Sequence, residues 1–346
     1  MADKKTNEGI RADIAKGWTP NSYLTNISVA HFQPDDWFVA PFIFPIVPVQ
    51  LSTSSYYIFN KGDLARDNVK RKPAYGKVEP MIFGQTTDLY ECKVDQVIVG
   101  IDSIAATDYR RAGTPGLHDP RRAKVIQATE QLKLHMDRLL AEGFFKADAW
   151  TNVFGGKATP SAAADSKEFH YFGDANFNPI DFFGKRKVEM MREGRRKPNV
   201  LALGVEAYEG LKQNPIILER VMSGGSTVNP ATVNQNVIAQ LLEVERVVVL
   251  NSTYNTAGYG KTDMQFICDS KGALLCYTES SPSIETPTAG YTFAWDFLAN
   301  GSYIMFDQWA GESGTHSEFV EGLMSIAPKK VCDELGIYLT DCVAAA

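Results

Sequence analysis

The feature that most constrains this chain is one long amphipathic helix, which the sequence predicts between Asp119 and Gly143. Asp119 is a favourable N-cap, Pro120 suits the first helical position because no N–H is needed there, and Gly143 is a natural stop. A narrow apolar stripe recurs at alternating intervals of four and three residues, and it consists of Val125, Thr129, Leu132, Met136 and Leu139. About 23 residues at about 1.5 Å each make a rod about 35 Å long, which should span a domain. Periodicity alone is equally consistent with a surface helix on an ordinary α/β domain.

Length and composition indicate an acidic protein with two lobes. A chain of 346 residues exceeds one typical compact core, and 44% apolar residues are enough to form a real core. A net charge of −6 argues against nucleic-acid binding by the chain as a whole. The polar start does not resemble a signal peptide, and the most apolar stretch, 38–51, is short and broken by prolines, so we expect no membrane partner. Five cysteines without metal-type spacing predict reduced thiols in a cytosolic protein.

The amino-terminal part of the chain should make little core of its own. Residues 1–37 carry scattered apolar anchors, so we expect an arm that lies on another part of the structure. Residues 38–50 contain three prolines at spacings of four and three, a pattern that excludes a helix and a central strand. This segment should therefore be extended, with its apolar side chains covered.

A long polar excursion follows. Ser55–Phe59 is predicted to be a strand, and Leu89–Ile101 alternates well enough to form another. Between them, the part from Lys61 to Glu79 carries six cations and three carboxylates. A structureless loop of this length is uncommon, so we predict a two-stranded hairpin that projects from the body. Because such a ribbon is only marginally stable alone in water, it should lie on another subunit.

The tip of this ribbon is the predicted contact surface between subunits. Its residues are Arg66, Lys70, Arg71, Lys72, Tyr75, Lys77, Met81 and Phe83. The same residue types would suit an RNA-binding loop. Because the whole chain is acidic, we favour docking of the basic tip on carboxylates of a neighbour.

The second half of the chain alternates helices and strands, as in an α/β lobe between about 176 and 290. Helices are predicted from Asn178-Pro179 to Glu193, at 205–213 and 216–222, and from Pro230; strands are predicted at 198–203 and 246–250. Two hairpins are predicted, one joining 263–268 to 273–278 and one joining 291–297 to 302–309 through Asn300-Gly301. A strand at 318–326, a short helix and a closing strand complete the chain.

No motif in the sequence indicates catalysis. The segment GYGKT, residues 258–262, resembles a phosphate loop, but it lacks the earlier glycine, and a strand rather than a helix should follow it. The five histidines form no metal-type cluster, so we expect neither a metal nor another cofactor. Spacing alone leaves a Ser-His-Asp triad open, but no G-x-S-x-G elbow occurs. We therefore do not interpret the chain as an enzyme.

A family resemblance rests on the order and lengths of several segments. They are FVAPFIFPIVPV at 38–49, YYIF with the polar excursion and YECKVDQVIVGID at 56–102, the helix at 119–143, and PNVLALGVEAYEGLKQNP at 198–215 followed by a helix and RVVVL. Together they resemble the major capsid protein of tailed bacteriophages, which has the Hong Kong 97-type fold. The resemblance covers about 30–340 and includes no single diagnostic motif.

The resemblance implies an α+β fold with named parts. In the family's terms, 1–50 is an amino-terminal arm, 51–100 the extended E-loop with its flanking strands, 101–175 the peripheral domain with the spine helix at 119–143, 176–290 the axial domain, 291–325 the return strands of the peripheral domain, and 326–346 the segment that returns to the axial domain. The resemblance further implies pentamers and hexamers that close into an icosahedral shell around double-stranded DNA. Scaffold, portal and decoration proteins would be further partners, and the location would be the virion capsid, assembled in the host cytoplasm.

Two other functions remain open at this point. An encapsulin-like nanocompartment shares the fold but would fill with enzyme instead of DNA. A soluble α/β enzyme with an active site assembled from scattered residues belongs to another class and would be a monomer or dimer.

Overall fold

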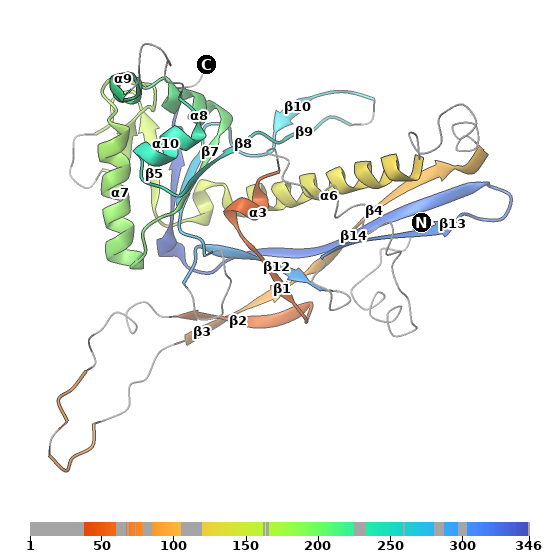
Figure 1. Ribbon diagram of the computed structural model, residues 1–346, viewed down its shortest axis with the longest axis horizontal. Coiled ribbons are helices and arrows are strands. Elements are labelled where there is room, and N and C mark those ends of the chain that lie inside the picture. The colour runs from red at the N-terminus through yellow and green to blue at the C-terminus, as the bar shows by residue number, and fades with distance from the viewer. Residues whose placement is uncertain are drawn as a thin grey trace.

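The computed structural model describes residues 38–59, 67, 69–72, 74–78, 85–104, 120–161, 163, 166–224, 233–258, 260–279, 287–296 and 303–344. These residues form a five-stranded sheet, a six-stranded sheet and two two-stranded ribbons. Figure 1 shows a rounded lobe at one end, from which a long helix and several long strands extend side by side. The predicted α+β class is confirmed.

The five-stranded sheet is organised around its longest strand, β14 (Ser317–Lys330). The first ten residues of β14 pair with β4 (Lys93–Asp102) on one edge, and β13 (Ile304–Ala310) pairs on the other. The last five residues of β14 pair with β12 (Gly290–Trp295), which in turn pairs with β1 (Ile46–Val49). At about 3.3 Å per residue, β14 is about 45 Å long and runs through the whole sheet.

The predicted hairpin between 291–297 and 302–309 is wrong. These segments form β12 and β13, but both pair with β14 and not with each other. An Asn-Gly pair predicts only a local turn. Which strands pair depends on which partner can form backbone hydrogen bonds along the full length of the strand.

Helix α6 (Pro120–Phe144) lies along β14 and β4 and matches the predicted long helix. Its buried stripe includes Val125, Ala128, Leu132, Met136 and Leu140. Gly322 of β14 makes the close approach possible, because a Cβ there would lie 3.1 Å from the Leu132 side chain. Leu139, which the sequence placed on the stripe, is only partly buried where it packs against the core, whereas Leu140 is buried.

One buried carboxylate joins three parts of the chain. Asp137 of α6 accepts hydrogen bonds from the backbone N–H of Ala40, at 2.9 Å, and from the hydroxyl of Ser252, at 2.5 Å. Ala40 begins α3 (Ala40–Ile43), and Ser252 follows β8 (Arg246–Leu250) of the other sheet. Burial raises the pKa of Asp137 to about 6, although these hydrogen bonds oppose the rise.

The proline-rich segment differs in part from its prediction. The exclusion of a helix is wrong, because Pro41 lies in the first turn of α3, where its missing N–H breaks no hydrogen bond. The exclusion of a central strand is confirmed, because β1, which contains Pro48, lies at the edge of its sheet.

The six-stranded sheet forms the rounded lobe. Its strand order is β6 (Glu168–His170), β5 (Val153–Lys157), β15 (Gly336–Thr340), β11 (Ala273–Cys276), β7 (Val200–Gly204) and β8. Its helices are α7 (Pro179–Gly194), α8 (Val205–Lys212), α9 (Pro215–Gly224) and α10 (Gln235–Leu241). Short 3₁₀ turns at Ala147–Ala149 and Asp333–Leu335 lead into β5 and β15.

The predicted hairpin between 263–268 and 273–278 is also wrong. Strand β11 lies between β7 and β15, whereas β10 (Met264–Phe266) pairs with β9 (Thr253–Asn255) in a separate ribbon. All four residues of β11 are buried. Such an apolar segment is covered better in the middle of a sheet than in an exposed hairpin.

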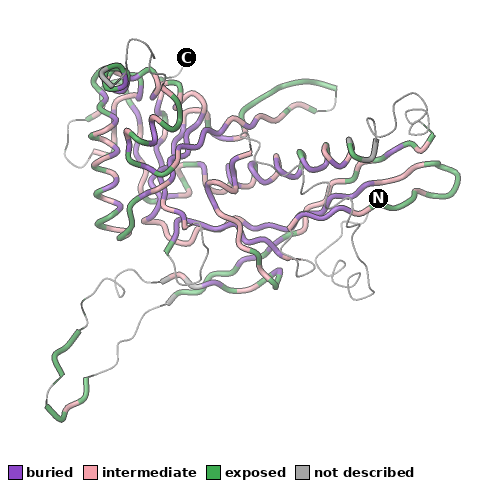
Figure 2. The backbone as a smooth tube through the Cα atoms, in the orientation of Figure 1, coloured by how far each residue is buried: buried purple, intermediate pink, exposed green. Residues whose placement is uncertain are grey.

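Figure 2 shows buried residues along the strands of the rounded lobe and along the contact of α6 with β14, whereas the described ends of the ribbons are exposed. One apolar core connects both regions, and Leu132, Phe306 and Leu203 all belong to it. The long helix therefore links the two sheets through continuous packing.

Truncation of the buried stripe tests this role of the helix. Leu132→Ala should lower the free energy of unfolding by about 2–5 kcal/mol, because Leu132 is only 3% exposed and the truncation removes its packing contacts. Chemical denaturation of the dissociated subunit would measure the change. A loss below about 0.5 kcal/mol, which is usual for a surface site, would contradict the packing described.

Asp137→Asn tests the buried carboxylate through the pH dependence of stability. The native pKa lies above the ordinary value of 3.8, so the native state holds the proton more tightly than the unfolded state. The contribution of Asp137 is therefore most favourable below about pH 4 and declines as pH rises through about 6. Because asparagine does not titrate, wild type should lose about 2 kcal/mol relative to the variant between pH 4 and pH 7.5. Urea titrations at both values measure this, and a difference that does not change with pH would contradict it.

Candidate assembly interface

The polar excursion is anchored by a small aromatic core of its own. Strands β2 (Thr53–Phe59) and β3 (Gln85–Glu91) pair in antiparallel register and form the base of the ribbon. Tyr90 stacks on Phe293 of β12 with ring centroids 4.5 Å apart, and Tyr56 lies 5.4 Å from the same ring. This cluster is separate from the main core. The ribbon is therefore held against the five-stranded sheet by packing at its base.

Hydrogen bonds add direction to this contact. The Tyr56 hydroxyl donates to Asp88 at 2.8 Å and lies 3.1 Å from the carbonyl oxygen of Lys330, at the end of β14. Burial and the bond to Asp88 raise the pKa of Tyr56, and the same bond lowers the pKa of Asp88. The phenol thus stays protonated and the carboxylate stays charged at neutral pH, so the bond persists.

The predicted strand at 89–101 is two strands, because the chain changes partner at Cys92. Before it, β3 pairs with β2; after it, β4 pairs with β14. Cys92 is fully buried, and its N–H donates to the carbonyl of Ser52 at 2.8 Å. The alternating pattern continues through the bend, so the sequence showed no break.

The described part of the ribbon tip lies far from the body in Figure 1. Its predicted contact residues Lys70, Arg71, Lys72, Tyr75 and Lys77 are all exposed to solvent. The other three predicted residues, Arg66, Met81 and Phe83, lie outside the described residues. Docking of this tip on a neighbour therefore stays a prediction.

A second exposed surface lies on α7. Asn178 caps the helix by accepting from the N–H groups of Ile180 and Asp181, and Phe183 and Met190 face the core. On the outer side Lys185 pairs with Asp181 at 2.8 Å, and Val188 is 59% exposed.

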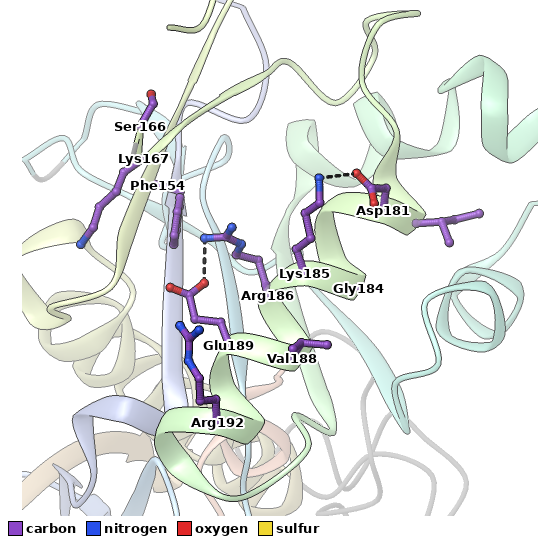
Figure 3. A pocket seen from close by; sticks show the side chains of 11 residues that line it. Phe154, Ser166, Lys167, Asp181, Gly184, Lys185, Arg186, Val188, Glu189 and Arg192 are labelled. Carbon is purple, nitrogen blue, oxygen red and sulfur yellow. Dashed lines mark ion pairs between the residues drawn. The ribbon is translucent and has the colours of Figure 1, made fainter. Parts of the chain in front are cut away.

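A cavity of about 840 Å³ adjoins this helix. One wall is the Phe154 ring of β5, and the guanidinium of Arg186 lies 4.1 Å from its centroid. Arg186 also pairs with Glu189 at 2.7 Å. Figure 3 shows both side chains reaching toward Phe154, while Val188 points away from it. The cavity therefore combines an aromatic wall with paired charges.

Catalytic features are sparse in the described part of the chain. No group of three His, Cys, Asp or Glu side chains could hold a metal ion there. The same residues contain no helix that is long and apolar enough to span a membrane. Gly258 and Gly260 lie on the connection from β9 to β10, so a strand stands where a phosphate loop needs its helix. All five cysteines are free thiols.

Sequence reasoning missed three features of these surfaces. In the sequence, Asp137 looks like an ordinary solvent-exposed carboxylate on α6. No local pattern predicts that the Ser252 hydroxyl donates a hydrogen bond to it. The aromatic base combines Tyr56, Tyr90 and Phe293 from distant segments. The cations of α7 were visible in the sequence as a run after Gly184, but their position beside a cavity was not.

The fold is the one found in phage capsid proteins. The structure is similar to the capsid structure of the cyanophage P-SCSP1u, with a TM-score of 0.50 and 11% identity over 86% of each chain. It is also similar to a phage-related protein from Bordetella bronchiseptica RB50, with a TM-score of 0.70 and 16% identity over 94% of this chain and 98% of that one.

The sequence is also similar to that of a named phage protein. The chain is 22% identical over 236 residues to the major capsid protein of Burkholderia phage BcepMu, an alignment that covers 67% of this chain and 68% of that protein. No family model matches the chain. The resemblance to phage major capsid proteins is therefore confirmed.

Proposed function

We propose that this chain is a phage major capsid protein that assembles into an icosahedral shell. The observation that carries the proposal is the likeness over nearly the whole length to a phage-related protein, joined by the sequence similarity to a named major capsid protein. A capsid role is structural, so the chain acts through its contacts and not through catalysis. Its location is the virion capsid.

The named parts of the family follow from this proposal. We assign the β2–β3 ribbon as the E-loop, α6 as the spine helix, the five-stranded sheet as the peripheral domain and the six-stranded sheet as the axial domain. Pairing of β5 with β15, and of β6 with β5, supports an axial domain that begins soon after Phe144, earlier than residue 176. Residues 1–37 belong to the amino-terminal arm in this assignment.

Physical reasoning supports assembly through contacts between unlike surfaces. A ribbon with an exposed tip gains stability only when a neighbour covers it, and repeated heterologous contacts close into rings and shells. We infer that pentamers and hexamers enclose double-stranded DNA, with scaffold, portal and decoration proteins as further partners and with assembly in the host cytoplasm. A chain of net charge −6 suits a container that must not trap the packaged polyanion.

Electron microscopy of the purified protein tests the proposal. Negative staining should show closed particles of megadalton mass, and size exclusion should place the protein at the void volume. A stable monomer or dimer would contradict the shell and favour a soluble α/β enzyme. Particles that retain a specific enzyme and no DNA when isolated from their natural source would favour an encapsulin-like compartment.

Charge reversal at the ribbon tip tests the predicted contact. Changing Lys70, Arg71 and Lys72 together to Glu should slow or stop assembly at low salt, because the tip would repel carboxylates of the neighbour. Each exposed ion pair contributes only about 0–1 kcal/mol, but a shell repeats the contact at every subunit. Salt screens such charges within about 8–10 Å, so raising the ionic strength should restore part of the yield, measured by sedimentation.

A charge-preserving variant controls for altered shape. Lys70→Arg, Arg71→Lys and Lys72→Arg together keep the three positive charges and should assemble like wild type. If the Glu variant assembles like wild type at every ionic strength, the basic tip faces solvent and the docking contact is wrong.

A further inference from the structure

Helix α7 and the turn after it form a strongly basic segment outside the β2–β3 ribbon. Residues 185–197 contain seven cations and two carboxylates, a local excess of five positive charges. The whole chain has a net charge of −6, so the remainder has a net charge of −11. A second copy of the chain therefore carries net negative charge outside this segment.

The exposed face of α7 is also apolar. Val188 is 59% exposed and Met191 is 42% exposed, and they lie between the charged residues Lys185 and Arg192. Residues three and four apart share one face of a helix, so these four side chains form a single stripe. Methionine and arginine are enriched at protein–protein interfaces.

The cavity beside this stripe has a buried donor without an acceptor. The Nε atom of Arg186 is buried and makes no hydrogen bond. A buried N–H group without a partner costs about 1–3 kcal/mol, and Arg186 is held there by its contact with Phe154. Gly184 also lines the cavity, and a Cβ built there meets nothing within 4 Å.

We propose that the exposed face of α7 and its cavity dock an acidic surface of a second copy of this chain. The inference rests on the proposed shell, because it adds a contact between subunits that is distinct from the ribbon tip. A protein surface fits better than nucleic acid for two reasons. Lys185 and Arg186 are already paired with carboxylates, and Val188 and Met191 would face a phosphate backbone without gain.

Gly184→Tyr fills the proposed docking site without disturbing the subunit. A Cβ at this position meets nothing within 4 Å, and replacing a helical glycine should not lower stability. The melting temperature should therefore stay at or above the wild-type value. The yield of particles in sedimentation should fall by about tenfold, the effect of weakening a contact by about 1.4 kcal/mol.

Gly143→Tyr is the matched control. Gly143 also lies in a helix, near the end of α6, and a Cβ there meets nothing within 4 Å. This variant should assemble like wild type. If Gly184→Tyr also assembles like wild type, the proposal is overturned.

A charge variant separates a protein partner from nucleic acid. Lys185→Glu combined with Arg192→Glu should lower the particle yield, whereas Lys212→Glu, an exposed lysine paired with Glu209, should not. If the double variant keeps normal assembly but no longer retains a short DNA duplex that wild-type particles bind, the face is a nucleic-acid surface and the proposal fails.

If wild type forms only small oligomers, the shell itself is wrong. The α7 contact is then supported if Gly184→Tyr reduces those oligomers to monomers, and overturned if it does not.

Discussion

The packing of one long helix against one long strand supports most of this structure. Helix α6 and β14 lie in contact over several turns, and the absence of a side chain at Gly322 lets Leu132 approach the sheet. The same helix carries Asp137, which holds α3 and the segment after β8. Because one apolar core continues from this contact into the six-stranded sheet, the two sheets are not independent units. The elongated body of the subunit therefore depends on this spine.

The exposed parts of the molecule depend on the buried ones for their direction. The aromatic base around Phe293 sets where the β2–β3 ribbon leaves the body, and the hydrogen bond from Tyr56 to Asp88 adds a polar constraint. A projecting ribbon that could swing freely would lose entropy on each contact with a neighbour. Preorganisation at the base would therefore favour the proposed contact of the ribbon tip with a neighbour. The α7 face is likewise held rigid by Phe183 and by buried Lys187, which donates to the carbonyl of Leu242 at 2.9 Å.

Individual helices and strands followed from the sequence wherever local signals were strong. The N-cap Asn178, the prolines at helix starts and the apolar period of α6 predicted elements that the structure contains. The errors concern partners. Both predicted hairpins failed because β14 and β15, from the end of the chain, insert beside strands that are closer in sequence. The candidate contact residues at the ribbon tip followed from charge and length, whereas the α7 cavity required knowledge of which strand lies beside the helix.

The sequence by itself determined the kind of element at each position and the order and lengths that resemble a capsid protein. Helical period, caps, prolines and alternating polarity act within a few residues, so they can be read along the chain. Only the tertiary structure decided which strands pair, that Leu140 is buried more deeply than Leu139, and that Asp137 is buried. These outcomes depend on competition among distant segments for backbone hydrogen bonds and apolar cover, and the segments that succeed satisfy both over their full length.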